Sequence, residues 1–95
     1  MLVTMAEKKP RELERIMKGV ANHRRISILR LLEEKPERSL IEICDSLKMN
    51  FKTASEHGKK LVAGGLILKQ YQGNHVRHAL SPRGKAVLKF LSTIE

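Results

Sequence analysis

The spacing of the apolar residues changes at Gly64-Gly65, and this change restricts the folds open to the chain. Before the glycine pair, apolar residues recur every three or four positions, which indicates amphipathic helices. After it, two short runs (residues 66–71 and 75–80) flank Gly73-Asn74, which is typical of a β-hairpin. We expect both Gly73 and Asn74 to adopt positive φ angles in the turn. Ser81-Pro82 then returns the chain to a helix.

Four helices are expected before the hairpin and one after it, each opening at a recognisable signal. The signals are a proline at a first helical position, Asn or Ser caps and one Ser-x-x-Glu capping box, at Pro10, Asn22, Ser39–Glu42, Asn50 and Ser81-Pro82. The expected helices cover residues 10–19, 23–34, 40–48, 51–63 and 82–95. Two short helices joined by a tight turn and followed by a basic hairpin predict a winged helix-turn-helix. The predicted fold is mainly α with a small β-hairpin, in the order α-α-α-α-β-β-α.

The length of 95 residues permits one domain, residues 1–95, with no room for a second core. Aromatic residues make up 3% of the chain, which argues against an aromatic platform for single strands. The apolar runs are too short to span a membrane, and residues 1–6 lack the basic leader of a signal peptide. One cysteine, Cys44, cannot form an internal disulfide. We therefore expect a cytoplasmic binding module.

The formal net charge of +9 indicates a polyanionic partner, of which nucleic acid is the commonest. Residues 51–95 carry 8 basic and 2 acidic groups, so the positive charge is concentrated in the second half of the chain. A lysine-rich solvated surface, as in thermophilic proteins, is the alternative explanation of the charge.

The fourth helix, residues 51–63, has the pattern of a recognition helix for the major groove of DNA. Ala54, Gly58 and Leu61 share one side and are expected to pack on the preceding helices. The N-terminal half of such a helix faces the base edges, and Lys59 and Lys60 lie further along, where phosphates are expected. The other interpretation is an ordinary solvated face. The expected base-reading residues are Lys52, Thr53, Ser55 and Glu56.

The hairpin, or wing, adds basic residues over positions 69–77. A hairpin tip is about as wide as a minor groove, whose negative potential favours Arg and His. Ser81-Pro82 also leaves amide donors free at a helix N-terminus. The expected contacts with the minor groove or the backbone are Lys69, His75, Arg77, Arg83 and Lys85.

Metal, redox and catalytic sites are not expected, nor is any cofactor. Cys44 lies on an apolar stripe, where a small buried thiol is the ordinary occupant, although a redox role stays open. His75 and His78 are three residues apart on a strand, which places them on opposite faces. We expect His78 to be packed in the core. The chain contains no phosphate-binding glycine loop, HExxH motif or nucleophile elbow, so we do not expect an enzyme.

Two segments carry a family resemblance. Residues Ala21–Leu32 (ANHRRISILRLL) resemble the second helix of the ArsR family of winged-helix regulators. Residues Asn50–His57 (NFKTASEH), with Leu61 and Gly65-Leu66, resemble its recognition helix and the exit into the wing. The similarity covers about residues 20–85, and the MarR-like repressors share parts of it. The resemblance implies a homodimeric transcriptional regulator that pairs through its first and last helices.

The chain departs from the family pattern at several positions. Metal-sensing members carry a Cys-x-Cys pair in the third helix, and the matching positions here are Ser39 and Ile41, so that site is absent. Gly58 stands where a larger apolar residue is usual, and Lys60 is polar where the pattern is often apolar. These two departures leave the packing of the fourth helix open.

Apolar residues are in surplus at both ends of the chain, which predicts a homodimer through residues 1–20 and 82–95. These residues are Leu2, Val3, Leu13, Ile16 and Met17 at one end, and Val87, Leu88, Phe90, Leu91 and Ile94 at the other. The alternative is that the N-terminal residues fold over the last helix of the same chain. Two-fold symmetry predicts an inverted-repeat operator in double-stranded DNA.

Two functions are consistent with the sequence. The favoured function is a sequence-specific transcriptional regulator of double-stranded DNA, acting as a homodimeric repressor. The alternative is a winged-helix module that binds protein or RNA in a larger assembly, which a carboxylate at Glu56 on the reading face mildly favours.

Overall fold

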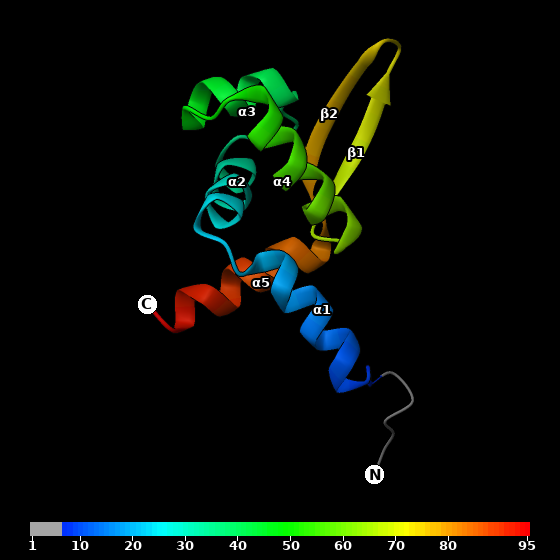
Figure 1. Ribbon diagram of the computed structural model, residues 1–95, viewed down its shortest axis with the longest axis vertical. Helices are drawn as coiled ribbons and strands as arrows, with labels where there is room; N and C mark the ends of the chain where they lie inside the picture. The colour runs from blue at the N-terminus through cyan, green and yellow to red at the C-terminus, as the bar shows by residue number, and fades with distance from the viewer. Residues whose placement is uncertain (1–6) are drawn as a thin grey trace.

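The computed structural model describes residues 7–95, which form five helices and one two-stranded antiparallel sheet (Figure 1). The elements are α1 (Pro10–Val20), α2 (His23–Glu34), α3 (Leu40–Leu47), α4 (Phe51–Ala63), β1 (Ile67–Gln72), β2 (His75–Leu80) and α5 (Pro82–Thr93). This order confirms the predicted winged helix-turn-helix. Among the described residues, no helix has both the length and the apolar character that crossing a membrane requires.

The helices begin where the capping residues predict. Asn22 Oδ1 accepts from the backbone N–H groups of Arg24 and Arg25 at 2.9 and 3.2 Å. Asn50 Oδ1 accepts from Thr53 N at 2.8 Å, which fixes the first turn of α4. Side-chain caps of this kind satisfy amide groups that have no partner within the helix.

The core lies between α2, α3, α4 and the base of the hairpin. Apolar positions of α2 and α4 supply its centre, where Leu29, Ala54 and Leu61 have no exposed surface. Leu66 and Ile67 close the core from the hairpin, and Leu88 of α5 covers its edge. The spacing of apolar residues in the sequence therefore predicts the buried faces of these helices.

The hairpin differs in detail from its prediction. β1 starts one residue later than expected and extends to Gln72, which pairs with His75 across a two-residue turn. Gly73 has a φ of 61°, but the expectation of a positive φ at Asn74 was wrong. A positive φ at the first turn residue alone is the pattern of a type II′ turn, in which the second residue needs no left-handed conformation.

A third segment joins the hairpin from the loop between α2 and α3. Arg38 N donates to His78 O at 3.0 Å, and His78 N donates to Arg38 O at 2.8 Å. The wing is therefore attached by backbone hydrogen bonds to the segment that leads directly into α3.

Candidate nucleic-acid interface

Helix α4 presents the residues that the sequence assigns to base reading. Lys52 and Glu56 are exposed, and Thr53 and Ser55 are half-buried beside them. The opposite side of the helix is buried through Ala54, Gly58 and Leu61, as predicted. Lys59 and Lys60 are exposed further along the helix. The structure thus brings six predicted residues together on one helix.

A hydrogen bond between the side chains of Arg25 and His57 connects α4 to the start of α2. Arg25 Nε donates to His57 Nδ1 at 3.1 Å. Arg25 Nη1 donates to the carbonyl oxygens of Lys18 and Gly19, both at 3.2 Å, at the end of α1. One guanidinium therefore joins α1, α2 and α4. Burial, followed by the positive charges of Arg25 and Arg24, lowers the pKa of His57 below its usual value.

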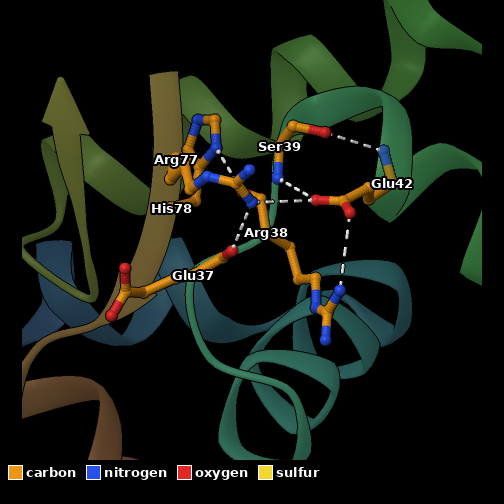
Figure 2. Close-up of polar contacts among 6 residues, drawn as sticks. All are labelled: Glu37, Arg38, Ser39, Glu42, Arg77 and His78. Atoms are coloured by element: carbon orange, nitrogen blue, oxygen red, sulfur yellow. Dashed lines mark hydrogen bonds and ion pairs between the residues drawn. The ribbon is translucent and has the colours of Figure 1, made fainter. Parts of the chain in front are cut away.

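The wing is held against α3 by a polar cluster formed by Glu37, Arg38, Ser39, Glu42, Arg77 and His78 (Figure 2). Arg77 Nη1 donates to Glu37 O at 3.0 Å and lies 3.4 Å from Glu42 Oε1. Arg38 Nη1 lies 3.4 Å from the other oxygen of Glu42. Arg77 therefore uses part of its donor capacity within the protein, between the wing and α3.

Glu42 is the acceptor at the centre of this cluster. Its Oε1 accepts from Ser39 N at 2.8 Å, and Ser39 Oγ accepts from Glu42 N at 3.2 Å, which completes the predicted capping box. The hydrogen bond from the Ser39 backbone lowers the pKa of the Glu42 carboxyl group, and the positive charges of Arg38 and Arg77 act in the same direction. A single carboxylate thus caps α3 and binds an arginine of the wing.

The remaining wing residues lie on both faces of the hairpin. Lys69 pairs with His78 and shares its face, whereas His75 and Arg77 occupy the opposite face. Lys69 and His75 are exposed. His75 pairs with Gln72 next to the turn, and so lies at the tip of the wing.

Arg83 and Lys85 lie apart from the recognition residues. Arg83 Nη1 donates to Gly64 O at 2.9 Å, at the C-terminal end of α4. The helical rise places Gly64 about 18 Å along the axis from Lys52. Lys85 is exposed in the first turn of α5. The structure thus places Arg83 at the base of the wing and not beside the start of α4, so neither Arg83 nor Lys85 is assigned a DNA contact.

His78 and Cys44 occupy packed positions. His78 is 5% exposed, and its Nδ1 lies 3.2 Å from Arg38 O, which confirms the expectation of a packed histidine. Burial lowers the pKa of His78 and raises that of the Cys44 thiol. Within residues 7–95, no group of three His, Cys, Asp or Glu side chains is arranged to hold a metal ion.

The sequence analysis did not anticipate the cross-element contacts of Arg25 and Glu42 or the exposure of Phe51. Arg25 and Glu42 act across elements, through His57 and Arg77, and no local pattern announces such contacts. Phe51 is the first residue of α4, and its side chain is 58% exposed. A large apolar residue at the first position of a recognition helix was the sequence signal that could have drawn attention to Phe51.

This geometry defines a winged helix-turn-helix of the DNA-binding class, with an exposed recognition helix and a basic wing. The family model described as bacterial regulatory protein, arsR family, matches residues 22–69. The chain belongs to the ArsR family, a non-enzymatic class of transcriptional regulators.

Solved structures agree with this assignment. The chain is 30% identical to a homodimeric winged helix-turn-helix DNA-binding domain from Mycobacterium bovis, described as a possible ArsR-family transcriptional regulator. That match covers 95% of this chain and 88% of the Mycobacterium bovis domain, with a TM-score of 0.75. It is 28% identical to HlyU from Vibrio cholerae, with 93% and 96% covered and a TM-score of 0.78. NolR from Sinorhizobium fredii is 20% identical, with 99% and 94% covered and a TM-score of 0.82, a similarity of fold alone. A comparison with curated proteins found no match.

Proposed function

We propose that the protein is a homodimeric repressor that binds double-stranded DNA sequence-specifically in the cytoplasm. In this proposal the first turns of α4 enter the major groove, and residues 69–77 of the wing lie on the minor groove or the backbone. The observation that carries the proposal is the composition of α4, which combines a buried face with an exposed face of polar and basic residues.

Base reading is assigned to Lys52, Thr53, Ser55 and Glu56 because the N-terminal half of a recognition helix contacts base edges. A carboxylate at Glu56 suits the amino group of cytosine. Lys59, Lys60, Lys69, His75 and Arg77 are assigned to the phosphates or the minor groove, where positive charge is favoured.

The reading assignment predicts a loss of sequence preference in Lys52→Ala and in Thr53→Ala, by roughly 1–3 kcal/mol each. The measurement is the ratio of affinities for a duplex selected from genomic fragments and for a random duplex. Lys89→Ala removes one positive charge from the exposed side of α5 and should leave that ratio unchanged. Unchanged ratios in both α4 variants would exclude α4 as the reader.

The dimer is assigned to α1 and α5, which lie at the end of the molecule opposite the tip of the hairpin (Figure 1). Both helices expose large apolar side chains: Leu13 and Met17 on α1 are 50% and 46% exposed, and Phe90 and Ile94 at α5 are 52% and 64% exposed. Leu2 and Val3, which also belong to the predicted surplus, lie outside the described residues. The similar domain from Mycobacterium bovis, described as homodimeric, supports the same state here.

Sedimentation tests the dimer, and Phe90→Lys is the informative variant. Leu91, by contrast, packs against the core, so a charge there would also disturb the fold. The wild-type protein should sediment with twice the mass of 10.8 kDa at micromolar concentration, and Phe90→Lys with the single mass. Leu68→Lys, which alters a similarly exposed leucine of the wing, should remain dimeric. A wild-type mass of 10.8 kDa would refute the dimer.

An inverted-repeat operator follows from the dimer, and repression is a separate part of the proposal. Two α4 helices related by a two-fold axis require an inverted repeat, which selection of genomic fragments would reveal. Adding the protein to transcription from such a fragment should reduce the transcript. Affinity for the duplex should fall steeply with salt concentration, since phosphate contacts release counterions. Preferential binding to RNA or to an acidic protein would instead support the interaction-module alternative.

A further inference from the structure

Phe51 is an apolar side chain without a full set of packing partners in the chain. It is the first residue of α4 and 58% exposed. Among residues 7–95, it is the only exposed large apolar side chain on α4. Phe51 precedes Ala54 by three positions and Gly58 by seven, so it continues their apolar stripe beyond the point where the core ends. The helix therefore carries its apolar stripe out to its exposed N-terminal end.

The proposed dimer surface does not account for this exposure. α3 lies at the end of the molecule away from α1 and α5 (Figure 1), and only three residues separate α3 from α4. The start of α4 is held in place by Asn50, whose Oδ1 accepts from Thr53 N at 2.8 Å. Helical side chains tilt toward the helix N-terminus, so Phe51 is presented at the end of α4 that enters the major groove in the proposed function, although it lies off the face that carries Lys52 and Glu56.

We infer that Phe51 reads the 5-methyl group of a thymine in the major groove. This inference rests on the proposed DNA-binding function and names one base that the operator must contain. Of the groups that a base pair displays in the major groove, the thymine methyl is the apolar one, and an aromatic side chain is a suitable partner for it. The charged residues Lys52 and Glu56 cannot recognise this group, because they read donors and acceptors.

The test removes the methyl group without changing base pairing. A duplex selected by the wild-type protein from random-sequence DNA is prepared with each thymine replaced, one at a time, by deoxyuridine. In each half-site, one particular thymine should weaken wild-type binding about fourfold when it alone is replaced, which corresponds to one buried methyl group. Phe51→Ala should bind the thymine and deoxyuridine duplexes equally.

Ile41→Ala is the matched control, because Ile41 is 62% exposed on the neighbouring helix α3. This variant should keep the fourfold penalty for deoxyuridine. Since Phe51 is exposed, Phe51→Ala should fold as the wild-type protein does. The circular dichroism spectrum and the thermal midpoint of the variant, compared with those of the wild-type protein, test this expectation.

Two results would overturn the inference while leaving the proposed function intact. One is a selected duplex whose deoxyuridine substitutions cost nothing, and the other is a penalty that persists unchanged in Phe51→Ala. If the wild-type protein selects no duplex at all, the proposed function fails and the inference fails with it.

Discussion

Gly58 lies buried in the middle of the recognition helix, and replacing it with alanine should stabilise the protein. A β-carbon built at Gly58 would have no atom within 4 Å, apart from its chain neighbours and the nearby backbone of its own helix. The added methyl group therefore meets open space. Alanine is favoured over glycine inside a helix by about 1 kcal/mol, so the free energy of unfolding should rise by that amount. For a domain of this size the thermal midpoint should rise by roughly 4–8 °C.

Gly84 provides the opposite case in another helix. A β-carbon at Gly84 would stand 2.2 Å from Leu66 O and 3.0 Å from Leu80 Cδ2. Leu66 O also accepts from Ser81 N at 3.1 Å, so the junction between the wing and α5 would have to move. Gly84→Ala should therefore lower the free energy of unfolding by about 1–3 kcal/mol, the usual cost of overpacking.

Urea denaturation followed by far-ultraviolet circular dichroism measures the free energy of unfolding of both variants. All samples are compared at one protein concentration, because the stability of a dimer depends on concentration. Gly58 lies on the packed side of α4, so affinity for DNA should not change in Gly58→Ala. A less stable Gly58→Ala would show that the space beside Gly58 is filled in the folded protein. If Gly58→Ala and Gly84→Ala changed the free energy of unfolding equally, the space around each glycine would not determine whether alanine stabilises the protein.

Removal of Arg77 should weaken binding to every duplex by a similar factor and reduce the salt slope by about one. Arg83→Ala removes the same charge at the base of the wing and should leave the slope unchanged; equal slopes in both variants would exclude Arg77 from the phosphates. The lowered pKa of His57 means that, as the pH falls below about 6.5, the unfolded chain binds a proton before the folded protein does, so stability is lost on acidification. His57→Gln keeps an acceptor for Arg25 but cannot titrate. Between pH 7.5 and 5.5 its free energy of unfolding should therefore fall less than that of the wild-type protein. An equal fall in both proteins would show that His57 is not the source of the acid sensitivity.

Local signals in the sequence predicted most of the fold because they act within a few residues. The caps at Asn22, Ser39 and Asn50 each bond to an amide two or three positions away, so each is visible in a short stretch of sequence. The turn between α3 and α4 is different. Lys48 adopts the left-handed conformation there, with a φ of 55°, a role that glycine or asparagine usually signals. No residue preference pointed to Lys48.

Contacts between distant segments could not be predicted in the same way. The backbone pairing of Arg38 with His78 spans 40 residues, and the contact between Arg77 and Glu42 spans 35. Both depend on where the folded chain places two segments, and neither leaves a periodic pattern. These contacts set the position of the wing relative to α3, so the detailed geometry of the interface follows from the tertiary structure.

The arginines and lysines of the interface divide into two groups that net charge alone does not distinguish. Arg25, Arg77 and Arg83 each donate to at least one backbone carbonyl, at distances of 2.9 to 3.2 Å. Within residues 7–95, no ion pair or side-chain hydrogen bond engages the lysines of α4 and β1, which are Lys52, Lys59, Lys60 and Lys69. A guanidinium has several donors in a rigid fork and can bind fixed carbonyls, whereas an ammonium group is a mobile point charge. The arginines therefore position α4 and the wing, with Arg77 keeping part of its donor capacity for the proposed DNA partner. The lysines remain free to meet the phosphates.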